Sequence, residues 1–185
     1  MKRFEKAGFT LIEIMIVVAI IALLAAIAIP NVLRGRTSAN EAAAVGNLRA
    51  LTSGNEMYRS VNNVYAQTAN WQADMYPAGG VPAFGPQPFN IAMTGQTVQG
   101  YNYTFNGRPA GCTDAAGNCT QYAILAAPQT LNQTGTRSFF VNETGTVRHC
   151  IGTGTLAGGV AAAGPPAVVT NWVTIDVQPP AAGCT

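Results

Sequence analysis

The sequence is poor in charge and lacks the residue patterns of the commoner catalytic sites. Asp, Glu, Lys and Arg make up 10% of its 185 residues, against roughly 25% in an average soluble protein. The net charge of +2 is too small for a surface that neutralises many phosphates, so no direct nucleic-acid site is expected. No glycine-rich phosphate loop or nucleophile elbow is present. These absences argue against an ordinary cytosolic enzyme.

The few charges are unevenly placed. Both lysines, Lys2 and Lys6, lie in the first eight residues, whereas residues 61–185 carry seven charged side chains. The polar residues of that long stretch are mainly Asn, Thr and Gln instead. A monomer that has to stay soluble on its own usually carries more charge. The composition therefore favours a subunit that packs beside copies of itself.

Four cysteines, Cys112, Cys119, Cys150 and Cys184, all fall in the C-terminal half. An even count behind an export-type N-terminus predicts two disulfides in an oxidising compartment. Of the three pairings, Cys112–Cys119 with Cys150–Cys184 is favoured, because the first closes a turn-rich stretch and the second pins the C-terminus. Zinc is the competing interpretation, but there is no Cys-x-x-Cys, and the single histidine, His149, stands next to Cys150.

Residues 9–29 form an apolar run of 21 residues. As a helix this run is about 32 Å long, enough to cross a bilayer core. The basic residues before it place the N-terminus in the cytoplasm and the remainder outside. A secretory signal peptide cleaved between Ala25 and Ala28 is the alternative. The length of the run, and a glutamate near its start, argue against that alternative.

Glu13 is the charged side chain of this run, and a carboxylate in a membrane helix marks function by default. Residues 14–29 contain no cation to pair with it. The nearest cation would be an amine made by cutting the chain before Phe9. In one chain this amine would lie one helical turn from Glu13. Between chains with a small axial stagger, it would meet the next copy's Glu13.

The residues Lys6-Ala7-Gly8 followed by Phe9-Thr10-Leu11-Ile12-Glu13 resemble the prepilin-peptidase signal of type IV pilins and their pseudopilin relatives. The resemblance implies cleavage between Gly8 and Phe9 and N-methylation of Phe9. It also implies a role for Glu13 in assembly and register. Pro30 stands where many members of the family have a proline. It is read either as a kink at the membrane exit or, from the resemblance, as a site of local helix melting in a fibre.

The rest of the chain fits the α+β fold that the resemblance implies, a long helix packed on an antiparallel sheet of about four strands. We divide the chain into a leader (1–8), an apolar half-helix (9–29), an amphipathic half-helix (30–60), a loop (61–100) and a disulfide-pinned sheet region (101–185). Ala44, Leu48, Leu51 and Tyr58 recur at helical spacing and are predicted to face the core. Alternation predicts strands at 101–105, 121–127, 138–141 and 146–150, with a last strand near Val173. The turn Asn142–Gly145 joins a predicted hairpin.

We therefore predict a non-enzymatic structural protein without cofactor or metal, the major subunit of a type IV pilus. Its expected partners are its own copies in a helical filament, prepilin peptidase, the inner-membrane assembly machinery and, before assembly, membrane lipid. Its expected location is the bacterial inner membrane and then the extracellular filament. The alternative is a pseudopilin of a type II secretion system or a minor competence pilin. A membrane-tethered enzyme or binding domain is disfavoured, because the sequence offers no candidate residues for one. A catalytic role for His149 and a calcium site at Asp114 with Asp74 or Asp176 are also disfavoured.

Overall fold

The computed structural model describes residues 9–78, 83–90, 93–107, 121–152 and 173–174. Its first element is the helix α1 (Leu11–Asn62), 52 residues long. Aliphatic residues, then alanines, sustain this helix, and Pro30 lies inside it. It ends at Asn62, and the next residue, Asn63, has a φ of 60°, the left-handed conformation that commonly terminates helices. The two predicted half-helices are therefore parts of one element, which ends two residues later than expected.

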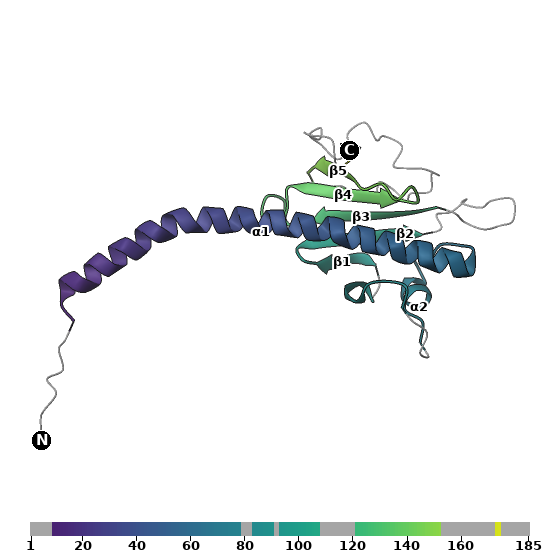
Figure 1. The fold of residues 1–185 in the computed structure, drawn as a ribbon, viewed down its shortest axis with the longest axis horizontal. Helices are drawn as coiled ribbons and strands as arrows, with labels where there is room; N and C mark the ends of the chain where they lie inside the picture. The colour runs from purple at the N-terminus through teal and green to yellow at the C-terminus, as the bar shows by residue number, and fades with distance from the viewer. Residues whose placement is uncertain (1–8, 79–82, 91–92, 108–120, 153–172, 175–185) are drawn as a thin grey trace, which may run out of the picture. The chain divides into compact units, whose positions relative to one another are not determined.

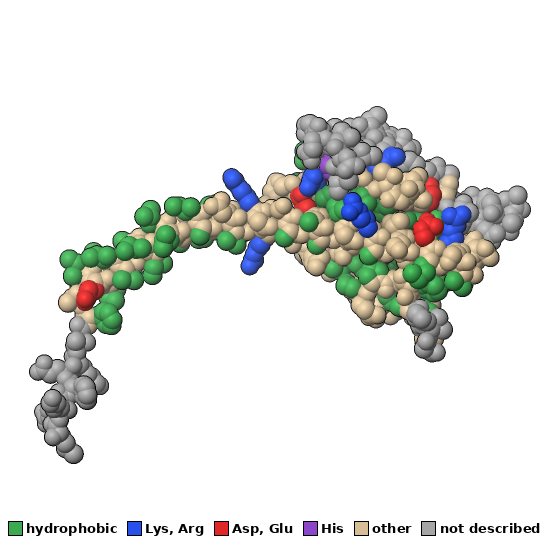
Figure 2. Space-filling view, viewed as in Figure 1, with side chains coloured by type: hydrophobic (Ala, Val, Ile, Leu, Met, Phe, Trp, Pro, Cys, Tyr) green, Lys and Arg blue, Asp and Glu red, His purple; other side chains and the backbone are tan. Residues whose placement is uncertain are grey.

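The chain forms two compact units, Met1–Arg36 and Thr37–Thr185. In the first unit, the aliphatic side chains of α1 are exposed along its length, as Figure 2 shows. The helix is long and apolar enough to cross a membrane, with a mean hydropathy of 3.0 in its most apolar window and none of that window buried. This agrees with the predicted membrane segment.

The second unit packs the remainder of α1 against an antiparallel sheet (Figure 1). Within the described residues, the sheet has six strands in sequence order, so each pairs with its neighbours along the chain. They are β1 (Thr94–Val98), β2 (Tyr101–Gly107), β3 (Tyr122–Pro128), β4 (Arg137–Asn142), β5 (Arg148–Ile151) and β6 (Val173–Thr174). The predicted α+β class and the predicted hairpin are confirmed, with β4 and β5 pairing antiparallel.

The sheet is wider than the predicted four strands, because β1 pairs with β2. Strand β1 lies within the stretch 61–100, which was expected to be a loop. That stretch also contains α2 (Trp71–Met75) and the 3-10 helix η1 (Gln87–Phe89). These short elements form because Trp71, Met75 and Phe89 are buried in the core with Leu48 and Leu51. The many prolines and glycines of the stretch favoured a loop prediction and concealed these anchors.

The core lies between α1 and one face of the sheet. The predicted helix positions Ala44, Leu48, Leu51 and Tyr58 are all buried there. They meet aromatic rings that alternate along β2 and β4, as expected for strands with one apolar face. Tilted and edge-to-face ring pairs, such as Phe89 with Tyr103 at 4.8 Å, add specific contacts.

Part of the opposite face of the sheet, on β3, β4 and β5, is also buried. Strand β3 is buried at every residue, and its outward side chains form a second cluster. The members of this cluster are Ala123, Leu125, Ala127, Phe140 and Cys150.

Candidate functional site

The start of α1 is organised around Glu13. The Thr10 amide and hydroxyl both donate to Glu13 Oε2, at 2.8 and 2.7 Å, and the Glu13 amide donates to Thr10 Oγ1 at 3.3 Å. This reciprocal arrangement is a capping box, in which two backbone donors of the first turn are satisfied. The Thr-x-x-Glu pattern that signals a capping box stands in the sequence, but this capping box was not predicted from it. The carboxylate is thus held at the helix start, one turn from Phe9, whose side chain is exposed.

Beyond Glu13, the side chains up to Leu33 carry no charge. The large aliphatic residues among them, from Leu11 to Leu33, are at least 50% exposed in the subunit. Monomeric soluble proteins rarely expose an apolar surface of this extent. The arrangement is therefore suited to burial in lipid or against other helices, with one carboxylate at its end.

Pro30 lies in the helix without ending it. A proline in a helix interior removes a backbone donor and clashes with the preceding turn. The next residue, Asn31, donates from Nδ2 to the carbonyl of Ile27 at 3.1 Å, which adds a side-chain bond across this turn. This bond does not replace the one that Pro30 omits, because the carbonyl left without its backbone donor is that of Ala26, four residues before the proline.

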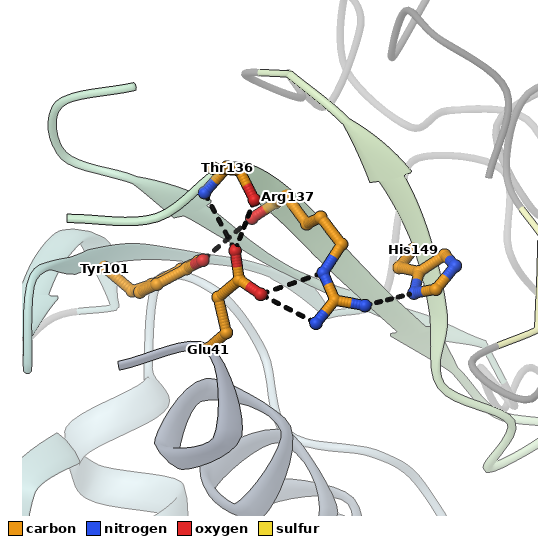
Figure 3. Close-up of polar contacts among 5 residues, drawn as sticks. All are labelled: Glu41, Tyr101, Thr136, Arg137 and His149. Atoms are coloured by element: carbon orange, nitrogen blue, oxygen red, sulfur yellow. Dashed lines mark hydrogen bonds and ion pairs between the residues drawn. The ribbon is translucent and has the colours of Figure 1, made fainter. Parts of the chain in front are cut away.

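A second carboxylate, Glu41, joins α1 to the sheet (Figure 3). Its Oε1 accepts from the Thr136 amide at 2.8 Å and the Thr136 hydroxyl at 2.7 Å. Its Oε2 accepts from Arg137 Nε at 2.9 Å and Nη2 at 2.6 Å. The Glu41 side chain is only 9% exposed and that of Arg137 28%. Both guanidinium donors converge on this one carboxylate oxygen, so the pair is held by two charge-assisted hydrogen bonds. We call the Glu41 carboxylate, with its bonds to Thr136 and Arg137, the Glu41 latch.

The surroundings of the Glu41 latch hold it in place. The Tyr101 hydroxyl donates to the Arg137 carbonyl at 2.9 Å, and Asn40 Nδ2 donates to the Thr134 carbonyl at 3.0 Å. Burial raises the pKa of Glu41, but the hydrogen bonds from Thr136 and Arg137 and the Arg137 charge outweigh it, so the pKa lies below its usual 4.5. Glu41 is therefore ionised at neutral pH.

His149 lies beside the Glu41 latch. It is fully buried on β5, with Nδ1 3.4 Å from Arg137 Nη1 and its ring next to Phe139. Arg137 can donate to this nitrogen only when Nδ1 is unprotonated. These neighbours give His149 a packing and hydrogen-bonding role within the sheet.

The other predicted site residues divide between the described and undescribed parts of the chain. Cys150 is buried and disulfide-bonded. Gly8, Cys112, Cys119 and Cys184 lie outside the described residues, so the predicted pairings stay predictions. Among the possible calcium ligands, Asp114 and Asp176 also lie outside them, and Asp74 accepts from the Gln67 amide at 2.8 Å. Within the described residues, no three His, Cys, Asp or Glu side chains cluster as a metal site would require.

The described residues thus combine an exposed apolar helix, with a carboxylate in its capping box, and a compact domain with its own core. Residues 3–29 match the prokaryotic N-terminal methylation motif. The chain is 31% identical over 106 residues to the type II secretion system core protein G of Klebsiella michiganensis, covering 56% of this chain and 75% of that protein. The chain belongs to the type IV pilin and pseudopilin superfamily.

Both branches of this superfamily occur among the relatives. The chain is 37% identical over 90 residues to the type II secretion system core protein G of Pseudomonas aeruginosa, covering 49% of this chain and 61% of the relative. It is 50% identical over 58 residues to the type IV wide pilus major component PilA4 of Thermus thermophilus, covering 31% of this chain and 44% of the relative. The chain thus spans less than two thirds of these two relatives. No solved structure matches it significantly.

Proposed function

We propose that this chain is the major subunit of a type IV pilus, inserted in the inner membrane and then assembled with its own copies into a surface filament. The observation that carries the proposal is the unburied apolar half of α1, with Glu13 held at its start. Such a surface is compatible with lipid in the free subunit and with neighbouring helices in a fibre. The domain beyond it is compact and has its own core.

Removal of the leader would also change the net charge of the subunit. Cleavage between Gly8 and Phe9 by prepilin peptidase would remove three basic side chains and one acidic one, leaving 10 − 3 = 7 basic and 8 − 1 = 7 acidic. The mature subunit would have neutral side chains overall and no lysine. Its one amine would be the methylated N-terminus at Phe9.

In assembly, we assign Glu13 the role of pairing with the Phe9 amine of a neighbouring copy. In lipid, a Glu13 carboxylate without a cationic partner makes it less favourable for the helix to remain in the membrane. In the filament, the pairing would offset this cost and set the axial register. The capping box leaves Glu13 Oε1 without a hydrogen bond among the described residues, so a second donor has an acceptor to approach. Pro30 is assigned to local loosening of the helix during the same step.

The second candidate is a pseudopilin of a type II secretion system. It is favoured by the longer alignments, which extend over 90 and 106 residues for the core protein G relatives and 58 for PilA4. The two candidates share the helix and its processing, and they differ in the filament that forms.

Intact mass spectrometry of filaments sheared from cells separates these functions. A dominant species of residues 9–185, with one added methyl and four fewer hydrogens, supports the pilus, the processing and two disulfides together. A processed chain found in membranes but absent from sheared material favours the pseudopilin. An unprocessed chain in both fractions would contradict both candidates.

A further inference from the structure

We infer that Arg34 and Arg36 bind the phosphate groups of anionic lipids in the extracytoplasmic leaflet, and that this contact fixes the depth of α1 in the membrane. The inference deepens the proposed function and rests on it, since it concerns the subunit before assembly. Both arginines belong to the first unit, Met1–Arg36, and lie at its end opposite Glu13.

The first argument is length. Between Glu13 and Arg34, α1 has 20 residues without a charged side chain. At 1.5 Å per residue these extend for about 30 Å, the thickness of the hydrocarbon core of a bilayer. The charged residues at the two ends of this segment therefore coincide with the two boundaries of the core. The span lies a few residues further along the chain than the expected 9–29.

The second argument is the position of the two arginines. Both side chains are exposed, and the sequence has no acidic residue between Glu13 and Glu41. Residues two apart in a helix are separated by about 200° around its axis, so the two guanidinium groups extend on opposite sides. Figure 2 shows basic side chains that project from both sides of α1 beyond its apolar part. At this point the helix can therefore contact more than one lipid headgroup.

The third argument is the chemistry of the contact. Arginine presents a planar fork of donors that matches the oxygens of a phosphate. Its aliphatic stem lets the charged group reach the interface from a Cα at the edge of the hydrocarbon. Gly35, between the two arginines, leaves room for a headgroup, because a Cβ added there would meet nothing within 4 Å. Two positive charges in a segment without acidic residues favour a lipid of net negative charge, such as phosphatidylglycerol.

The first unit has no aromatic residue that could anchor this end of the helix instead. Trp and Tyr commonly hold membrane helices at the interface, but neither occurs between Phe9 and Tyr58. The depth and tilt of a membrane helix are set in part by such interfacial residues. At the outer end of this span, the arginines are the residues suited to that role.

Processing would increase the importance of this contact. Before cleavage, residues 1–8 provide three basic side chains at the cytoplasmic end. Their removal would leave Arg34 and Arg36 as the basic side chains that flank the span. The mature subunit would then be held mainly at its outer end, by contacts that have to break when the subunit is extracted for assembly.

The test is native mass spectrometry of the chain isolated from membranes, in micelles with equal amounts of phosphatidylglycerol and phosphatidylcholine. The species without residues 1–8 is expected to retain phosphatidylglycerol preferentially. Arg34→Gln combined with Arg36→Gln should lower this preference about 25-fold, because each arginine near an anionic surface contributes about fivefold. Arg34→Lys combined with Arg36→Lys should keep most of it, since the charge is kept. Arg49→Gln is the matched control, because Arg49 is also exposed on α1.

Three results would overturn the inference: equal retention of the two lipids, an unchanged preference in the double glutamine variant, or an equal loss in Arg49→Gln. Displacement of the lipid by an excess of inorganic phosphate would also overturn it, because the site would then bind free phosphate and not a headgroup. A preserved lipid preference in a chain that never appears in sheared filaments would support the lipid contact and count against the proposed pilus function.

Discussion

Breaking the Glu41 latch should destabilise the sheet domain more than the substitution of any exposed charged residue. Glu41→Ala removes the acceptor of four hydrogen bonds and leaves Arg137 without its carboxylate. Removing one partner of a buried ion pair costs roughly 3–5 kcal/mol. The Arg137 side chain keeps 28% of its surface exposed, so water can partly replace the carboxylate. We therefore expect a loss near the lower limit, about 3 kcal/mol.

The assay is urea unfolding of the mature chain in micelles, followed by tryptophan fluorescence, since Trp71 is buried in the core. A double-mutant cycle of Glu41→Ala with Arg137→Met should give a coupling energy of about 1–3 kcal/mol. Arg49→Met is the control, because Arg49 is exposed on α1 and no described residue bonds to its side chain. A coupling energy below about 0.5 kcal/mol would refute the latch.

The same pair predicts an acid dependence. The pKa of Glu41 is lower in the folded domain than its usual 4.5. Its contribution to stability is therefore fully present above pH 4.5 and is lost as the pH falls through the folded pKa. The wild-type chain should lose stability over this acidic range more steeply than the Glu41→Gln variant. Parallel curves for the two chains would show that Glu41 does not titrate as described.

Three further predictions concern other parts of the molecule. Thr10→Val should lower the helix content at the start of α1 in micelles, measured by circular dichroism and amide hydrogen exchange. Thr10→Ser should not, because it keeps the capping box with Glu13. Equal effects of the two variants would contradict a role for the capping box. Burial, with a hydrogen bond to the Glu56 carboxylate, raises the pKa of Tyr65 to about 12. The domain should therefore lose stability between pH 10 and 12, and the Tyr65→Phe variant should lose less. The same dependence of stability on alkaline pH in the variant and the wild type would argue against this. Gly107→Ala should destabilise the domain by about 1–3 kcal/mol, measured by urea unfolding, because the new Cβ would collide with the Ala66 carbonyl. No change in stability would mean that the segment at Ala66 moves to make room.

The sequence predicted the fold class because its periodicities were strong. The apolar run gave the first half of α1, and the spacing of Ala44, Leu48, Leu51 and Tyr58 identified the face that the structure buries. Alternating residues located β2, and the Asn142–Gly145 turn located the hairpin of β4 and β5. These features depend on neighbours a few residues apart, so local patterns are enough to reveal them.

The Glu41 latch could not be predicted in the same way. Glu41 and Arg137 are 96 residues apart, and no local pattern connects them. One signal was present, since Glu41 lies three residues before Ala44 and thus in phase with the buried face of α1. A carboxylate on that face requires a partner. Which of the few distant arginines supplies it depends on strand register, which is decided by the packing of the whole sheet.

The order of the strands has a consequence for how the domain folds. From β1 to β6, each described strand pairs with the one made just before it. A sheet of this kind has short sequence separations between partners, which lowers the entropic barrier to folding. Each strand can add to an open edge as soon as it emerges, onto a helix that was made first. The sheet can thus grow in the direction of synthesis, without waiting for its last residues.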